Sequence, residues 1–153
     1  MKRLYWLIGL SLMALSTGCL SDIVTTPQLK TLTERRIYIE PIQSENPQVG
    51  QVLRDVIEKE FIRKKIKLGD PNTATVFITG STFMTVRGKS SETKVFVVGT
   101  GSSFASQAIE SISVIAKDKD GQILLTASYD NKKQYTASKL AKEFGKALAG
   151  KLK

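Results

Sequence analysis

The chain has 153 residues and a formal net charge of +9, because 23 Lys and Arg residues outnumber 14 Asp and Glu residues. It contains one cysteine and no histidine. Zinc sites built on His or Cys, Ser-His-Asp triads and Cys-His nucleophile pairs therefore cannot be assembled, and no disulfide can form within the chain. A chain of this length suits one domain rather than two.

The first 18 residues predict an export signal. Lys2 and Arg3 precede an apolar run from Leu4 to Leu15, and small residues follow this run. With about a dozen apolar positions, the run is shorter than the roughly 20 residues that a membrane-spanning helix needs.

The single cysteine lies directly after this signal. Leu15-Ser16-Thr17-Gly18-Cys19 resembles a bacterial lipobox, in which the cysteine thiol is acylated and the signal is cleaved before it, between Gly18 and Cys19. Ser16 stands where leucine is usual, and Leu15 lies one place further back. The resemblance implies a lipid anchor on Cys19. The alternative is an ordinary secretory signal with an incidental cysteine, or an uncleaved anchor.

Lipidation would leave a mature chain that begins at Cys19 and has a charge of +7, since Lys2 and Arg3 are lost with the signal. This charge indicates either a solvated lysine-rich surface or an anionic partner. Phospholipid head groups, lipopolysaccharide, an acidic cell-wall polymer or an acidic protein patch suit an exported protein better than nucleic acid does. Leu20 follows the anchor in place of Asp, which resembles an outer-membrane address on the periplasmic face. Apart from the covalent lipid, no cofactor is expected.

Residues 19–34 contain Pro27 and have neither a helical nor a strand period, so they predict a lipidated tether. Fully extended, about fifteen residues would span roughly 50 Å. Residues 35–153 follow as a single α/β domain, which begins with a strand at 35–42. Because an unpaired strand edge can recruit a partner strand, this strand supplies a candidate interaction edge formed by Arg35, Arg36, Tyr38 and Glu40.

A helix is predicted from Pro47 to about Lys65. Asn46 is a favoured N-cap, and proline suits the first helical position. Glu60 and Lys64 are four residues apart and are predicted to pair on the solvent side. Apolar residues recur at steps of three and four, which predicts one buried stripe formed by Val49, Val52, Leu53, Val56, Ile57 and Phe61.

Four longer strand runs follow a short strand at 66–68 and a turn at 69–72. The run 74–85 has a nearly continuous apolar start, which indicates cover on both faces, and Gly80 within it predicts a bend or bulge. Residues 94–98 form the second run. The runs 108–116 and 122–129 flank an Asp-Gly at Asp120 and Gly121, which is a strong hairpin signal.

The last stretch predicts a helix that closes the domain. Its large apolar residues lie on one side and its lysines on the other, so packing on the sheet is favoured over insertion into lipid. The element order β-α-β-β-β-β-β-α predicts an α+β fold, an α/β sandwich, with a mixed and mostly antiparallel sheet and two helices against it. Neither 99–104 nor 118–121 has the spacing of a phosphate or calcium loop, so no catalytic or metal site is expected.

Several short motifs resemble those of a group of bacterial lipoproteins. They are residues 37–42 (IYIEPI), 49–53 (VGQVL), 74–81 (ATVFITGS) and 114–124 (VIAKDKDGQIL). Their order is similar to that in the α/β domain of the curli secretion lipoprotein, the penicillin-binding-protein activator lipoproteins and the N-terminal domain of TolB. The resemblance implies non-catalytic work, namely assembly, secretion or activation of an envelope machine through protein contacts.

The expected function is that of a membrane-anchored accessory or assembly factor with an envelope protein as its partner and no enzymatic site. Two alternatives stay open: an anionic lipid- or lipopolysaccharide-binding lipoprotein, and a homo-oligomeric subunit of an outer-membrane secretion channel. A channel of the curli type needs long amphipathic hairpins, for which residues 82–107 are the candidate, as a loop, a hairpin or a membrane-inserting segment. Alternation there falls short of the roughly 9–11 residues of a spanning strand, which disfavours a pore.

Overall fold

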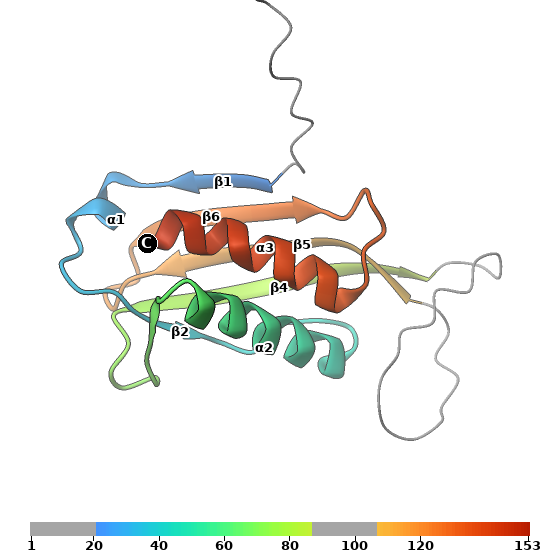
Figure 1. The fold of residues 1–153 in the computed structure, drawn as a ribbon, viewed down its shortest axis with the longest axis horizontal. Helices are drawn as coiled ribbons and strands as arrows, with labels where there is room; N and C mark the ends of the chain where they lie inside the picture. Colours follow the sequence, from blue (N-terminus) through green and yellow to red (C-terminus); the bar gives the residue numbers. More distant parts are fainter. Residues whose placement is uncertain (1–20, 87–106) are drawn as a thin grey trace, which may run out of the picture.

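The computed structural model describes residues 21–86 and 107–153. In chain order the elements are β1 (Ser21–Thr25), α1 (Pro27–Thr31), β2 (Arg36–Ile39), α2 (Pro47–Arg63), β3 (Lys67–Leu68), β4 (Val76–Val86), β5 (Gln107–Lys117), β6 (Ile123–Asp130) and α3 (Ala137–Leu152). The strands form one sheet in the order β1-β6-β5-β4-β2-β3, and Figure 1 shows the two long helices, α2 and α3, on the same face of it.

The sheet is mixed. β2 runs parallel to β3 and β4, and every other neighbouring pair is antiparallel. The predicted α+β fold, with two helices packed against a mostly antiparallel sheet, is thus confirmed. Four strand termini meet at one end of this sheet: the start of β1, the end of β4, the start of β5 and the end of β6. We call this the anchor end, because the predicted lipid attachment at Cys19 precedes β1.

The predicted tether is wrong for residues 21–31, which belong to the domain. Strand β1 pairs along its whole length with β6, and α1 follows directly. Ile23 pairs with Ala127 and packs on the core, whereas Val24 pairs with Thr126 on the opposite face of the sheet. A five-residue edge strand needs few core-facing side chains, so it produces no sequence period. The predictions for residues 1–20 and for 94–98 lie outside the described residues.

Helix α2 begins at the predicted cap. Asn46 Oδ1 accepts a hydrogen bond from the backbone N–H of Gln48 at 3.0 Å, and Pro47 occupies the first turn. The predicted solvent-exposed pair of Glu60 with Lys64 is wrong: Glu60 is buried and accepts a hydrogen bond from the guanidinium of Arg63. Helix α3 covers this turn of α2, since a Cβ added to Gly145 would lie only 3.2 Å from the Cβ of Glu60.

The predicted hairpin is formed by β5 and β6. Asp118 Oδ1 accepts hydrogen bonds from the backbone N–H groups of Asp120 and Gln122 at 2.9 and 2.8 Å, and Gly121 takes a φ of +82°. The predicted bulge at Gly80 is wrong, because the pairing of β4 with β5 stays in register there. Gly80 instead allows close packing, since a Cβ would lie 2.8 Å from the Val114 side chain.

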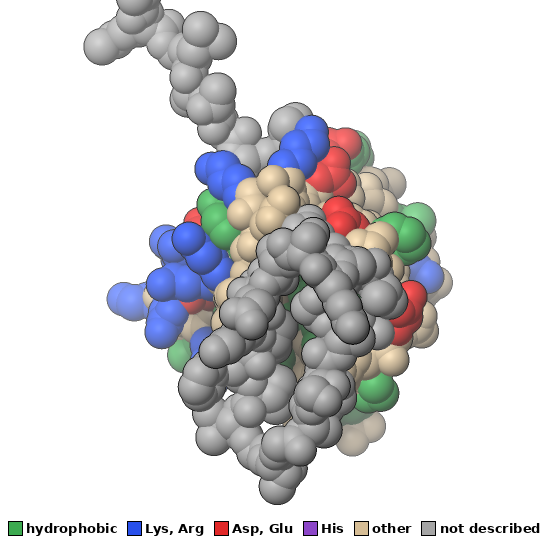
Figure 2. Space-filling model, turned by 90° about the vertical axis from the view of Figure 1, so that its right-hand side faces the viewer, with side chains coloured by type: hydrophobic (Ala, Val, Ile, Leu, Met, Phe, Trp, Pro, Cys, Tyr) green, Lys and Arg blue, Asp and Glu red, His purple; other side chains and the backbone are tan. Residues whose placement is uncertain are grey.

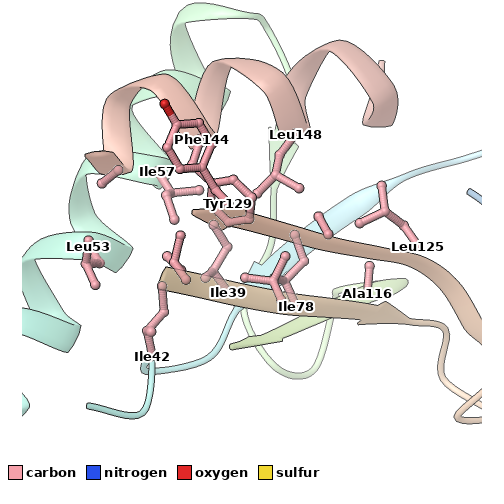
Figure 3. Packing of buried hydrophobic residues seen from close by; sticks show 14 of the residues in the cluster. Ile39, Ile42, Leu53, Ile57, Ile78, Ala116, Leu125, Tyr129, Phe144 and Leu148 are labelled. Carbon is pink, nitrogen blue, oxygen red and sulfur yellow. The ribbon is translucent and has the colours of Figure 1, made fainter. Parts of the chain in front are cut away.

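The core lies between the helices and one face of the sheet. Figure 3 shows Phe144 and Leu148 of α3 above Tyr129 of β6, and the rings of Tyr129 and Phe144 meet edge-on at 6.2 Å. Both α3 side chains are fully buried, so the prediction that the last helix packs on the sheet is confirmed. Each fully buried side chain of this size contributes roughly 1.5–3 kcal/mol, which fixes the helix layer to this one face.

Candidate interaction surface

The second face of the sheet is covered by neither long helix, and we call it the outer face (Figure 1). Its side chains come from alternate residues of each strand, and strand pairing sets them in rows. The rows are Phe77, Lys117 and Ile123; then Thr79, Ile115, Thr126 and Val24; then Ser81, Ser113, Ser128 and Asp22; then Phe83, Ser111 and Asp130. Among the described residues, neither long helix covers this face of β4, which contradicts the predicted cover on both of its faces.

Small hydroxyl side chains occupy the middle of the outer face. Strands β4, β5 and β6 each alternate Ser or Thr with core residues there. Short side chains leave the surface nearly flat, and each hydroxyl can both donate and accept a hydrogen bond. The set is Thr79, Ser81, Ser111, Ser113, Thr126 and Ser128.

Several large apolar side chains surround these hydroxyls and are open to solvent. Phe83 is 62% exposed, Val24 57%, Ile123 46% and Ile115 37%. Single exposed apolar residues are ordinary, but several on one flat face are typical of an interaction surface. The sequence prediction of an interaction site did not include these residues, although the alternation of hydroxyl and apolar residues along β4, β5 and β6 was the available signal.

Charge is distributed unevenly over the outer face. Asp22 and Asp130 are exposed at the anchor end. At the opposite end, Glu34 pairs with Arg36 at 3.0 Å and lies 3.7 Å from Lys67. The hydrogen bond from Arg36, aided by the charges of both cations, holds the pKa of Glu34 below its ordinary value. The carboxylates at the anchor end thus leave that half of the outer face negative.

Helix α3 carries the opposite charge, because four of its five charged side chains are lysines and the fifth, Glu143, pairs with Lys146 at 3.2 Å. Lys139, Lys142 and Lys146 of α3 are exposed and lie three and four residues apart, so they form one stripe that points away from the sheet. We call this stripe the lysine face. Figure 2 looks onto the anchor end and shows Lys and Arg gathered on the left, where the helices lie, with hydrophobic side chains and carboxylates on the right.

The candidate edge predicted from Arg35, Arg36, Tyr38 and Glu40 is not an open sheet edge, because β2 lies between β3 and β4. The Arg35 guanidinium donates hydrogen bonds to the carbonyl oxygens of Leu29 at 2.8 Å and Leu152 at 3.0 Å, so it holds α1 and the end of α3 together. It also donates to the Lys153 carbonyl oxygen at 2.9 Å. Arg35 is a structural residue of the described domain.

The other residues of that predicted edge lie on or beside the outer face. The ring of Tyr38 lies edge-on to that of Phe77, with centroids 6.3 Å apart, and the Arg54 guanidinium lies 5.8 Å from the Tyr38 centroid. Arg36 and Tyr38 pair with β3 and β4 respectively, and the backbone N–H of Glu40 donates to the Ile78 carbonyl. These residues therefore lie beside an exposed face of the sheet and not along an unpaired strand.

A shallow hollow of about 550 Å³ lies between the end of β2 and the start of α2. Among its described lining residues Arg54 is the one ionisable group, and its guanidinium donates to Glu58 at 3.0 Å. The hollow therefore offers no pair of titratable side chains for acid-base chemistry. It is lined by Pro41, Ile42, Gln43, Ser44, Pro47, Gln51 and Arg54.

The described residues form a small two-layer α+β domain, and solved structures share its fold. A PelC variant from Paraburkholderia phytofirmans, solved as a dodecamer, superposes with a TM-score of 0.58 at 11% identity, covering 88% of this chain and 98% of that one. A second PelC dodecamer from the same organism gives 0.53 at 11%, covering 87% and 96%. A PDZ domain protein from Parabacteroides distasonis gives 0.53 at 12%, covering 84% of this chain and 34% of that one.

Other comparisons identify no relatives: no family model matches the chain, and no curated protein matches its sequence. At such low identities the solved structures share the fold alone, so the resemblance to the curli secretion group stays a prediction. Within residues 21–86 and 107–153, no helix has the length and apolar character needed to cross a membrane. Gly18 and Cys19 lie outside the described residues, so lipidation also stays a prediction.

Proposed function

We propose that this chain is a lipid-anchored, non-catalytic protein of the bacterial envelope that acts as a subunit of a homo-oligomer. The observation that carries the proposal is the outer face, on which Phe83, Val24, Ile123 and Ile115 are exposed around a flat field of hydroxyls. A two-layer domain of this size normally keeps such a set of apolar side chains against a partner. The PelC structures that share the fold are dodecamers, which supports a second copy as that partner.

The test is the mass of the full chain in solution. The protein is expressed with its own signal, extracted from membranes in a mild detergent, and measured by light scattering coupled to size-exclusion chromatography. We expect one discrete multiple of the 16.8 kDa chain, less the signal if it is cleaved. A monomer at concentrations of tens of micromolar would contradict the proposal.

The anchor is tested separately by labelling cells with a palmitate analogue. We expect the wild-type chain to incorporate the label and the Cys19→Ser variant to lose it, because Cys19 is the one thiol of the chain. Labelling that survives the substitution would disprove the lipobox. This outcome leaves the oligomer itself untouched, since the outer face does not include Cys19.

A second candidate function is binding of an anionic lipid or of lipopolysaccharide. The observation that favours it is the lysine face, with exposed Lys151 further along the same helix and Lys153 at its C-cap. Vesicles containing anionic phospholipid would then retain the protein in a salt-sensitive manner, since exposed charges are screened at high ionic strength.

A further inference from the structure

We propose that copies of this chain join head to tail, with the lysine face of one copy seated on the outer face of the next. This inference rests on the proposed homo-oligomer and names the two surfaces that would form it. The two surfaces differ, so the contact is heterologous: every copy has one lysine face and one outer face to offer. Repeated head-to-tail contacts generate closed rings when the rotation closes, and filaments when it does not.

Complementary charge is the first reason. The lysine face presents Lys139, Lys142 and Lys146, and the outer face presents exposed Asp22 and Asp130. The outer-face cations Arg36, Lys67 and Lys117 all lie at the far end, where the first two pair with Glu34. Two copies approaching lysine face to lysine face would repel each other, whereas lysines against carboxylates attract and fix the register.

The lysines of α3 and the carboxylates of the outer face also lie at the same end of the domain along the strand direction. Helix α3 begins at the anchor end, where Asn131 donates its side-chain N–H to the carbonyl oxygens of Ile109 and Tyr135 at 2.8 and 2.9 Å. Lys139 to Lys146 covers roughly 10 Å of helix from there, at 1.5 Å per residue. Asp22 and Asp130 lie in neighbouring rows at the same end of the sheet. Neighbouring copies therefore need no shift along the strands to bring these charges together.

Shape gives a third reason. The hydroxyl side chains are short, and the apolar side chains of Phe83 and Val24 at their margins, with Ile115 between Thr79 and Thr126, are exposed. A helix packs well on such a surface, since small residues allow its backbone to come close. The β3 edge of the sheet is a poorer candidate, because β3 has only two residues with which to pair a strand of a neighbouring copy.

The arrangement is also compatible with a membrane anchor. Both proposed surfaces are faces of the two layers, and the anchor end lies at the strand termini, at right angles to the direction in which the layers stack (Figure 1). Copies stacked layer against layer would therefore present every anchor end on the same side. One flat membrane could then hold all the lipid chains of the assembly.

The test uses two variants, each of which blocks one surface. Ser113→Arg places a bulky cation in the middle of the outer face, and Lys142→Glu with Lys146→Glu reverses the lysine face. All these positions are exposed, so circular dichroism and thermal unfolding should show wild-type folding. The controls are Gln122→Arg, which also introduces an arginine, and Lys119→Glu, which reverses one charge, both at exposed positions in the β5–β6 turn. Masses are measured on full chains in detergent.

We expect the wild type and both controls to be oligomers and each blocked variant to fall to the monomer mass. Mixing the two blocked variants should give a 1:1 dimer that does not grow further, because only one intact pair of surfaces remains. Blocked variants that stay oligomeric, or a mixture that stays monomeric, would overturn the head-to-tail contact and leave the homo-oligomer standing. A monomeric wild type would overturn the proposed function itself. If Lys142→Glu with Lys146→Glu keeps the wild-type mass and loses only binding to vesicles of phosphatidylglycerol, the lysine face serves lipid instead.

Discussion

Gly50 is the residue at which the backbone of α2 comes closest to another segment. A Cβ built there would lie 2.1 Å from the carbonyl oxygen of Ile42, which is far inside contact distance and involves backbone on both sides. Gly150 in α3 is the reverse case, because a Cβ there meets nothing within 4 Å and the position is exposed. The two glycines therefore differ in what a methyl group would do.

We expect Gly50→Ala to lower the free energy of unfolding by about 1–3 kcal/mol, since overpacking against backbone forces α2 away from the β2–α2 loop. Gly150→Ala should raise it by roughly 0.5–1 kcal/mol, because alanine favours the helix and displaces nothing. Urea denaturation of both variants measures the two changes. If Gly50→Ala matched or exceeded the wild type in stability, the close approach would be wrong.

Asp70 supports a prediction about how its own pKa differs between the folded and the unfolded chain. Its Oδ1 accepts hydrogen bonds from the backbone N–H groups of Asn72 at 2.8 Å and Thr73 at 3.0 Å, and these bonds hold the pKa of Asp70 below its ordinary value. A carboxyl with a lowered pKa in the folded state adds stability above its unfolded pKa. That contribution is lost as the pH falls through the folded pKa. We therefore expect a carbon-detected NMR titration to give Asp70 a lower pKa in the native than in the urea-unfolded chain, and equal values would contradict the turn geometry.

At the scale of elements, Arg35 connects α1 and the start of β2 to the C-terminus, which lies more than a hundred residues later in the sequence. Its guanidinium donates to carbonyl oxygens of α1 and of the last residues of the chain, and it directly precedes β2. Arg36 next to it makes one exposed ion pair with Glu34. The two neighbours can therefore be compared directly: Arg35 hydrogen-bonds to several segments, whereas Arg36 makes a surface ion pair.

We expect Arg35→Gln to destabilise the domain by about 1–3 kcal/mol, because partly buried carbonyl acceptors lose charged donors. Arg36→Gln should cost less than about 1 kcal/mol, as is usual for exposed pairs. Hydrogen exchange in α1 should speed up in Arg35→Gln and stay unchanged in Arg36→Gln. Equal effects of both substitutions would show that the Arg35 contacts hold nothing together.

The helices and strands also show how much of this fold the sequence predicts. Long elements with their own signals were predicted correctly: the capped helix α2, the Asp-Gly hairpin of β5 and β6, and the amphipathic α3. Strand β1 was missed because its only signal is one core-facing Ile23, and its place is decided by pairing with β6 about a hundred residues later. Glu60 was misplaced because its burial depends on α3, which local periodicity cannot reveal.

The interaction surface was predictable only in part, for a related reason. Alternation of Ser and Thr with apolar residues marks an outer face on each strand, but the sequence does not say which strands become neighbours. The pairing brings Phe83, Ile115 and Val24 onto one surface from three separate strands. The sequence predicts an edge around Arg35 only if β2 is an outermost strand, whereas β2 lies between β4 and the short β3.

At the scale of the whole molecule, the position of β1 sets how the domain meets the membrane. Because β1 begins at Ser21, only Leu20 separates the sheet from Cys19, and two residues span at most about 7 Å. The expected tether of roughly 50 Å is therefore replaced by close attachment, provided that Cys19 carries the lipid. The anchor end must then lie at the membrane surface, and the β5–β6 turn must point away from it.

This orientation places two exposed lysines at unequal distances from the membrane surface. Lys132 follows β6 at the anchor end, and Lys119 lies in the turn at the other end of the eleven-residue β5. Such a strand is roughly 35 Å long at about 3.3 Å per residue. Spin labels on Lys132→Cys and Lys119→Cys, in proteoliposomes whose lipid headgroups carry a paramagnetic relaxer, should show strong relaxation at the first position and little at the second.

Inserting twenty Gly and Ser residues between Leu20 and Ser21 should reduce this contrast without unfolding the domain, because flexible chain then separates the sheet from its anchor. Equal relaxation at both positions in the chain without the insertion would mean that the anchor end does not lie at the membrane surface.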